Sequence, residues 1–355
     1  MQRATTRRAI LAGIAGGGVT LIEESLSLSP GAARDTNGSI PKPPAAARRH
    51  LGRDQASAAE SLILGAFHPN MPGDPSSLAD FAARYGRVPG LVMWFQAWGD
   101  ANFKDLDTSL LDRVSGANAT PVVTWEPWAP GQGANQSDFT LAKIHNGAYD
   151  DYIDQWAKGL KNWGGAVLLR FAHEMNGNWY PWAVADNTND NTAEDYVAAW
   201  QHVHNRFQNA KAGNVRWVWA PNVKYAGSAP LADLYPGDDY VDLIGMDGYN
   251  WGSSRRSSKW RSLANVFGPT YDELTAAHPN KPIIIAETGC PGQRPDKAEW
   301  IRKGFLSAVP NQFPLLQAVT YFDAKTDRDW RASTSRDVRK AFSAVVTSDR
   351  YRGVL

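Results

Sequence analysis

Residues 165–182 have the sequence GAVLLRFAHEMNGNWYPW, in which a short apolar run leads directly into a polar cluster. The apolar run has the length and composition of a buried strand, so the polar cluster begins where that strand ends. Glu174 is thereby placed at the rim of a sheet or barrel, beside a cation, an imidazole, a carboxamide and aromatic rings. This set of side chains is typical of a carboxyl group that acts on a sugar. The alternative is a connecting loop in which Glu174 and its neighbours only pack.

Short apolar runs recur along the chain and alternate with amphipathic stretches. Eight such runs over residues 60–350 favour a (β/α)8 TIM barrel of the α/β class, a fold that typically takes about 250 residues. An open α/β sheet is the alternative. The predicted strands are Leu62–Phe67, Leu91–Phe95, Pro121–Trp125, Ala166–Phe171, Val215–Trp219, Val241–Met246, Pro282–Ala286 and Ala318–Phe322.

Two of the stretches between these runs have clear helical periodicity. Their apolar residues are spaced by three or four positions, which places each set on one face of a helix. The second helix is predicted to begin at Thr192, because Thr192-Ala-Glu-Asp195 has the pattern of a capping box. The two buried faces are Ile153, Trp156, Leu160 and Trp163, and Tyr196, Trp200, Val203 and Phe207.

The composition is that of an ordinary globular protein, with 43% hydrophobic and 21% charged residues in a chain of 355. A formal net charge of +1 and the lack of a long basic run give no electrostatic basis for binding nucleic acid or an anionic membrane. The 15 Trp, 12 Tyr and 12 Phe are many, and aromatic faces suit the C–H faces of sugar rings, although large barrels also bury such rings. Cys290 is the one cysteine, so no intramolecular disulfide can form.

The N-terminus resembles an export signal. Thr5-Thr6-Arg7-Arg8 precedes an apolar stretch of about 14 residues, which is too short to span a membrane but suits a signal-peptide core. The paired arginines indicate the twin-arginine route. We therefore predict a signal peptide over residues 1–33, a Pro/Ala-rich linker over 34–59 and one domain over 60–350. The mature protein is expected to be secreted or held at the cell surface, with no membrane segment; a disordered cytoplasmic tail is the alternative.

Two glutamates follow predicted strands on opposite sides of the barrel, Glu174 after the fourth and Glu287 after the seventh. Because TIM-barrel active sites lie at the carboxyl ends of the strands, the two side chains can converge. Glycoside hydrolysis needs such a pair: one carboxyl group protonates the leaving oxygen, and the other attacks the anomeric carbon or activates water. A separation of roughly 5–5.5 Å gives retention of configuration, and a wider one gives inversion. Glu126, at the end of the third strand, is a third candidate that could replace either.

Polar and aromatic side chains stand at nearly every predicted strand end. Arg170 and Tyr249 can donate hydrogen bonds to an ionised nucleophile, whereas a ring such as Trp179 can raise the pKa of a general acid by desolvation. His173 is predicted either to orient a carboxylate or bind a sugar hydroxyl, or to be a structural hydrogen-bonding residue. The remaining predicted substrate-binding residues are His68, Trp94, Trp125, Asn222 and Trp251.

Other chemistries lack the residues that they need. In His173-Glu-Met-Asn-Gly177 a glycine stands where a zinc protease has its second histidine. His202 and His204 diverge by about 200° around a helix, so a shared metal is not expected. The sequence contains no G-x-S-x-G motif of an esterase, and Gly131-Gln-Gly133 lacks the third glycine of a dinucleotide-binding loop. We predict neither a metal site nor a cofactor.

The motif Arg170-Phe-Ala-His-Glu174-Met-Asn-Gly-Asn-Trp179 closely resembles the acid/base motif of glycoside hydrolase family 26, the β-mannanase family. Gly245-Met-Asp247-Gly-Tyr249 and Ile285-Ala-Glu287-Thr-Gly289 resemble its sixth- and seventh-strand signatures, and the resemblance spans roughly residues 60–346. It implies a retaining endo-glycosidase with Glu174 as acid/base and Glu287 as nucleophile. It also implies that Tyr249 hydrogen-bonds the nucleophile, that His173 and Arg170 support the site, and that Trp179 stacks on a sugar.

One position departs from the family pattern. Mannanases of this family usually have a Trp near the end of the eighth strand, whereas this chain has Tyr321-Phe322 there and Trp330 only further on. The family also contains mixed-linkage β-glucanases and xylanases, and Trp125-Glu-Pro-Trp128 would fit such a variant site. The leading hypothesis is a monomeric, exported endo-β-glycosidase that acts on a β-1,4-linked polysaccharide, first of all β-mannan. A mixed-linkage β-1,3-1,4-glucanase and a catalytically silent polysaccharide-binding barrel are the alternatives.

Overall fold

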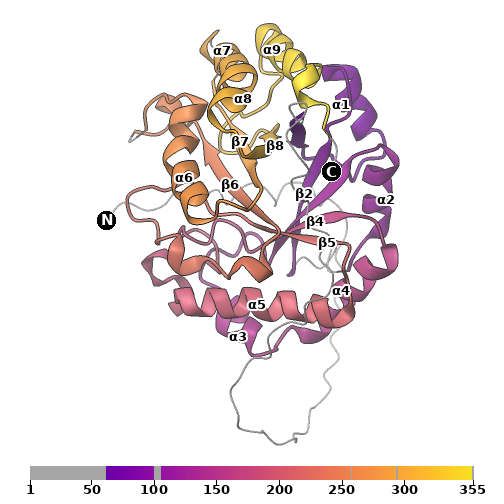
Figure 1. Cartoon of the computed structure of the whole chain (residues 1–355), viewed down its shortest axis with the longest axis vertical. Coiled ribbons are helices and arrows are strands. Elements are labelled where there is room, and N and C mark those ends of the chain that lie inside the picture. Colours follow the sequence, from indigo (N-terminus) through magenta and orange to yellow (C-terminus); the bar gives the residue numbers. More distant parts are fainter. Residues whose placement is uncertain (1–60, 100–104, 257, 293–294, 354–355) are drawn as a thin grey trace, which may run out of the picture.

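In the computed structural model, eight parallel strands close into a barrel in the order of the chain (Figure 1). The structure describes residues 61–99, 105–256, 258–292 and 295–353, so the predicted signal peptide and linker lie outside the described residues. The predicted (β/α)8 barrel is confirmed, and the pairing of the first strand with the last excludes the open sheet. The strands are β1 (Ile63–Phe67), β2 (Leu91–Ala97), β3 (Thr120–Glu126), β4 (Val167–Phe171), β5 (Val215–Trp219), β6 (Leu243–Tyr249), β7 (Ile283–Gly289) and β8 (Leu316–Phe322).

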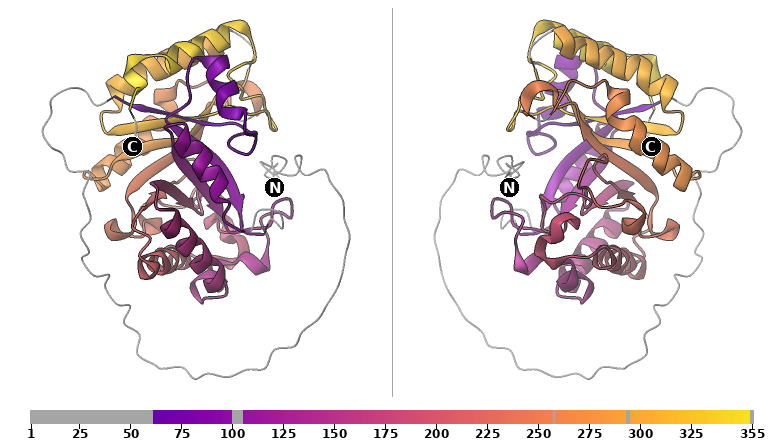
Figure 2. Two further views of the ribbon diagram at one scale, coloured as in Figure 1. Left: turned by 90° about the vertical axis from the view of Figure 1, so that its right-hand side faces the viewer. Right: turned by 90° about the vertical axis from the view of Figure 1, so that its left-hand side faces the viewer.

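Helices surround the strands on the outside (Figure 1). The two predicted amphipathic helices are α4 and α5, and the capping box of α5 is formed between Thr192 and Asp195. Figure 2 shows α9 lying against α1, where the end of the barrel domain meets its beginning. None of the helices in the described ranges is both long and apolar enough to cross a membrane. The helices are α1 (Ser77–Tyr85), α2 (Thr108–Gly116), α3 (Leu141–His145), α4 (Asp150–Trp163), α5 (Ala193–Ala210), α6 (Leu263–Ala277), α7 (Pro295–Lys303), α8 (Val309–Gln312) and α9 (Arg336–Val346).

The strands separate two apolar layers. An inner layer fills the barrel and includes Leu91, Met93, Val122 and Leu168. A larger outer layer packs between the strands and the helices. Because successive side chains of a strand point to opposite faces, only every second residue near a strand end faces the mouth of the barrel. Thr124 and Glu126 continue the inner face of β3, and Arg170 continues that of β4.

Strands β6 and β7 run beyond their predicted ends and carry two of the site motifs within the sheet. The predicted ends were Met246 and Ala286, whereas the observed ends are Tyr249 and Gly289. Glu287 therefore belongs to β7 itself rather than to the loop after it.

A register shift in this pair of strands turns Glu287 toward the barrel interior. The pairing slips by one residue before Asp247, so that Asp247 lies opposite Glu287. Strict alternation would direct Glu287 to the outer layer, where Ile285 packs. Because of the bulge, Ala286 and the next residue both face inward. Glu287 can thus reach Arg170 across the barrel.

Candidate active site

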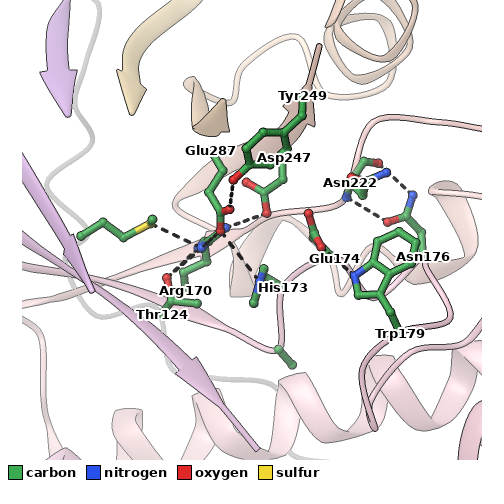
Figure 3. Close-up of polar contacts among 12 residues, drawn as sticks. Thr124, Arg170, His173, Glu174, Asn176, Trp179, Asn222, Asp247, Tyr249 and Glu287 are labelled. Atoms are coloured by element: carbon green, nitrogen blue, oxygen red, sulfur yellow. Dashed lines mark hydrogen bonds and ion pairs between the residues drawn. The ribbon is translucent and has the colours of Figure 1, made fainter. Parts of the chain in front are cut away.

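Arg170 is the buried cation at the centre of a polar cluster at the carboxyl ends of the strands (Figure 3). Its guanidinium donates to Asp247 Oδ2 at 2.6 Å, to Glu287 Oε1, and through Nε and Nη2 to Thr124 Oγ1 at 3.0 and 2.8 Å. Desolvation by itself lowers the pKa of Arg170, but the charges of Asp247 and Glu287 outweigh it and hold the pKa above its ordinary value. Arg170 therefore places a fixed positive charge between two acids.

Glu287 is held by a donor on each carboxylate oxygen. Arg170 donates to Oε1, and the hydroxyl of Tyr249 donates to Oε2 at 2.6 Å. The ring of His173 lies close by, with Nε2 3.9 Å from Glu287 Oε1. Two donors from different strands fix the carboxylate in one orientation, which is what attack on a bound substrate requires.

Glu174 lies in the loop after β4, where the backbone takes an unusual conformation. Its φ is 53°, and that of Ala172 is 43°, both in the left-handed region that costs non-glycine residues about 1–3 kcal/mol each. Backbone hydrogen bonds hold the loop in place: Glu174 N donates to Ala220 O at 2.7 Å, and Ala172 N donates to Trp125 O at 3.1 Å. The neighbouring strands β3 and β5 thus impose the conformation that positions Glu174.

The carboxyl group of Glu174 receives a hydrogen bond of its own. The indole Nε1 of Trp179 donates to Glu174 Oε2 at 2.7 Å, and Glu174 is fully buried. The positive charge of Arg170 interacts with Glu174 as well as with Glu287. Figure 3 shows the two glutamates in one cluster, with Asp247 and His173 in the space between them in this view. The structure therefore brings together the pair of glutamates that the sequence singled out, and gives each a different donor.

His173 is enclosed by aromatic rings. Its ring centroid lies 4.8 Å from that of Tyr180, 5.9 Å from that of Trp182 and 6.0 Å from that of Phe95. This packing fixes the imidazole beside Glu287.

Asn222 lies in the loop after β5, three residues beyond Trp219, and is hydrogen-bonded to the loop that carries Glu174. The side chain of Asn176 accepts from Asn222 N and donates to Asn222 O, each at 2.9 Å (Figure 3). The Asn222 carboxamide donates to Val223 O at 2.8 Å. These bonds give the two asparagines a role in joining the β4 and β5 loops.

Trp94 and Trp125 point away from the cluster, and the prediction that they bind substrate is wrong. Trp125 is fully buried in the outer layer, with ring centroids 5.0 Å from Trp156 of α4 and 5.9 Å from Phe207 of α5. Trp94 also packs in the outer layer, while its neighbour Met93 is in the inner one. Both residues are near a strand end, but on the face that the helices cover.

Trp251 and Trp330 form an aromatic wall behind Tyr249. The ring centroid of Trp330 lies 4.8 Å from Tyr249 and 4.9 Å from Trp251. The loop after β8 is fixed by the buried amine of Lys297, which donates to the backbone carbonyls on either side of Trp330 at 3.1 and 2.9 Å. Trp330 is thus brought back to the site although it lies beyond the end of the eighth strand in sequence.

His68 lies just after β1 and is only partly buried. Its Nδ1 accepts a hydrogen bond from Asn70 N at 3.3 Å. Burial lowers the pKa of His68, while the charge of Asp323 opposes this shift. His68 thus stabilises its own turn.

Asp247 and Thr124 belong to the cluster but were not predicted as site residues. A signal for each was available, because Asp247 is two positions before Tyr249 and Thr124 is two before Glu126, which places each pair on one face of its strand.

One group of residues has the spacing of a metal site. His173, Asp247 and Glu287 offer ligand atoms within 4.8 Å of one another. The guanidinium of Arg170 already pairs with both carboxylates and supplies the positive charge that a metal ion would bring. This donor set therefore fits an arginine-centred cluster rather than a metal centre.

The sequence model of glycosyl hydrolase family 26 matches residues 113–292, about half of the chain, and the match includes Glu174 and Glu287. The chain belongs to this family. It is 33% identical to Endoglucanase H of Acetivibrio thermocellus over 80% of its own length and 30% of that protein. It is 30% identical to the mannan endo-1,4-beta-mannosidase A and B of Caldalkalibacillus mannanilyticus over 55% of its length and 35% of that protein.

The chain thus spans about a third of the length of these two curated relatives. In fold it resembles a family 26 β-mannanase from Bacteroides ovatus, with a TM-score of 0.62 and 17% identity over 83% of this chain and 90% of the other. The predicted family membership is confirmed.

Proposed function

We propose that the protein is a retaining, endo-acting β-glycosidase that hydrolyses a β-1,4-linked polysaccharide of the mannan type. The observation that carries this proposal is the pairing of two buried glutamates with different donors. Glu287 is oriented by Arg170 and Tyr249, as suits a nucleophile, whereas Glu174 accepts a hydrogen bond from the indole of Trp179, a neutral donor.

In the proposed mechanism, Glu287 attacks the anomeric carbon while Glu174 gives its proton to the oxygen of the leaving sugar. The C–O bond of the glycosidic link breaks, and a glycosyl ester with Glu287 forms. Glu174 then takes a proton from water, which attacks the same carbon and releases Glu287. Arg170 holds the carboxylate of Glu287 in place both when it attacks the sugar and when it leaves.

The substrate is proposed from the named relatives. The name of the Caldalkalibacillus protein favours mannan, and that of Endoglucanase H, matched over more of this chain, favours a β-glucan as the second candidate. Reducing ends released from mannan, lichenan and xylan by the purified protein would test this. Fastest release from mannan would support the proposal, and fastest release from lichenan would favour the glucanase. Binding without release from any of the three would instead favour the silent barrel.

The stereochemistry of the product tests the two-step mechanism. We expect the first sugar released by the enzyme to have the β configuration at its new reducing end, because two inversions at the anomeric carbon restore the starting configuration. Proton NMR, recorded before the anomers equilibrate, measures this. An α product would show that water attacks directly and that Glu287 is not a nucleophile.

Tyr225 is proposed to extend the binding surface on the side of the leaving group. Its ring is 38% exposed and lies 5.8 Å from that of Trp179, the partner of Glu174. Tyr225→Ala is expected to raise KM for the polysaccharide about fivefold, equivalent to the ~1 kcal/mol typical of aromatic contacts, with little change in kcat. The control is Trp163→Ala at the far end of α4, before β4 begins, which should leave KM unchanged. An unchanged KM for Tyr225→Ala would remove this residue from the substrate path.

We also infer that the protein is exported through its N-terminal segment and acts outside the cytoplasm as a monomer. The Thr5-Thr6-Arg7-Arg8 motif and the apolar stretch after it support export. Appearance of the processed protein in the culture medium, and its elution as a monomer, would test both points.

A further inference from the structure

Glu126 is a third buried carboxyl group in the site, and the mechanism above does not use it. It stands at the last position of β3, on the inner face, and is 1% exposed. The indole Nε1 of Trp128 donates to Glu126 Oε2 at 3.1 Å. Trp128 is itself fixed by edge contacts with Tyr180 and Trp182, at centroid distances of 5.3 and 6.0 Å. Among the described residues, none donates a hydrogen bond to the other oxygen, Oε1.

The charges around Glu126 do not favour its ionisation. Within the described ranges, the charged groups that act on it are Arg170 from β4, Glu287 from β7 and Glu174 from the loop after β4. Arg170 is already committed to ion pairs with Asp247 and Glu287. An ionised Glu126 would therefore add a further negative charge to a buried cluster in which Arg170 is the one cation among the described residues, and burying an unpaired charge is costly.

The pKa of Glu126 agrees with this count of charges. Burial raises it from an ordinary value of 4.5 to about 8; the hydrogen bond from Trp128 and the charge of Arg170 lower it, whereas Glu287 and Glu174 raise it further.

We propose that Glu126 works as an un-ionised carboxylic acid that donates a hydrogen bond to a hydroxyl of the bound sugar. In this form its carbonyl oxygen, Oε2, accepts from Trp128, and its hydroxyl at Oε1 is left to donate to the substrate. Glu126 is thus a specificity-determining residue beside the two catalytic glutamates. This inference rests on the proposed function, because it requires a sugar in the site.

The protonation state can be tested without substrate, by comparing the Tm of the wild type and Glu126→Gln between pH 5 and pH 8. The folded protein keeps the proton of Glu126 up to about pH 8, whereas the unfolded chain loses it near 4.5. The folded state therefore binds more protons in this range, and the wild type loses stability as the pH rises. Glu126→Gln cannot titrate, so the Tm of the wild type relative to the variant is expected to fall steadily from pH 5 to pH 8.

The matched control is Glu299→Gln on α7, where the carboxyl group is exposed and Lys303 lowers its pKa. The Tm of the wild type relative to Glu299→Gln is expected to stay constant between pH 5 and pH 8. A Tm difference for Glu126→Gln that stays constant or rises with pH would mean that Glu126 is ionised in the folded protein, and would overturn the inference.

Kinetics test the contact with sugar. Glu126→Gln keeps a neutral donor and is expected to lower kcat/KM by less than about tenfold, whereas Glu126→Ala leaves the sugar hydroxyl unpaired and is expected to lower it by about 100-fold, mostly through KM. Equal losses in the two variants, or wild-type KM in Glu126→Ala, would overturn the sugar contact. If Glu126→Ala does not fold, the Tm profile of Glu126→Gln still tests the protonation state, and its kcat/KM still tests the sugar contact. If the wild type cleaves no polysaccharide, the proposed function is refuted, and the sugar contact with it. This outcome differs from a failure of the Glu126 inference alone, in which the wild type is active and only the comparison of the variants contradicts the inference.

Discussion

Glu287→Gln is expected to abolish hydrolysis, and Glu174→Gln to slow it by about 10²- to 10⁴-fold, the usual contribution of a general acid and base. Glu287 provides the oxygen that bonds to the sugar, and an amide cannot replace it. The loss of rate in Glu287→Gln should therefore exceed the 10²- to 10⁴-fold range expected for Glu174→Gln. Both substitutions keep the volume of the side chain, which confines the effect to the chemistry. The measurement is kcat on the preferred polysaccharide.

An activated substrate separates the two roles. An aryl glycoside with an acidic phenol needs no proton on its leaving oxygen, so Glu174→Gln should form the glycosyl-enzyme at a near-normal rate and then hydrolyse it slowly. Glu287→Gln should remain inactive on the same substrate. The control is Glu273→Gln, whose carboxylate pairs with Lys224 outside the site and whose loss should leave kcat unchanged. If Glu126→Gln formed the glycosyl-enzyme quickly and hydrolysed it slowly, and Glu174→Gln did not, Glu126 would be the general acid instead of Glu174.

The position of Glu174 was predictable from sequence because the signal is local. An apolar run that ends in a polar cluster marks the carboxyl end of a strand, and in a TIM barrel that end is the site. The motif also contains Arg170 and Trp179. In the structure Arg170 donates a hydrogen bond to Glu287, and Trp179 donates one to Glu174.

The facing of side chains at the strand ends was not predictable in the same way. Trp125 and Glu126 are adjacent, yet one packs against helices and the other faces the barrel interior. Strands of a parallel barrel are apolar on both faces, so the sequence shows no alternation from which to tell the faces apart. The bulge before Glu287 adds a second obstacle, because it depends on how β6 and β7 pair and leaves no local trace. The return of Trp330 to the site likewise depends on a distant lysine, Lys297.

Arg170→Met is expected to lower the free energy of unfolding by about 3–5 kcal/mol, the usual cost of leaving a buried charge without its partner. The substitution removes the only described cation that pairs with both Asp247 and Glu287, and it leaves the hydroxyl of Thr124 without its donor. Chemical denaturation measured by circular dichroism gives this quantity. The matched control is Arg206→Met: its guanidinium pairs with Asp150 and Asp154 in the same chemical manner, but it is 28% exposed, so a loss of at most about 1 kcal/mol is expected.

The pH dependence of the Arg170→Met deficit identifies its cause. Without the guanidinium, Asp247 and Glu287 are like charges in a buried site, and protonating them relieves the repulsion. The variant then binds protons more readily in its folded state, so its deficit relative to the wild type should shrink as the pH falls from 7 toward 4. A deficit of the same size at every pH would indicate lost packing instead of uncompensated charge. Arg170→Lys separates the effect of the charge from that of the planar guanidinium, because lysine restores the charge but cannot bind two carboxylates at once. We expect this variant to recover stability at neutral pH only in part. Its kcat should recover less than its stability, because Glu287 remains poorly oriented.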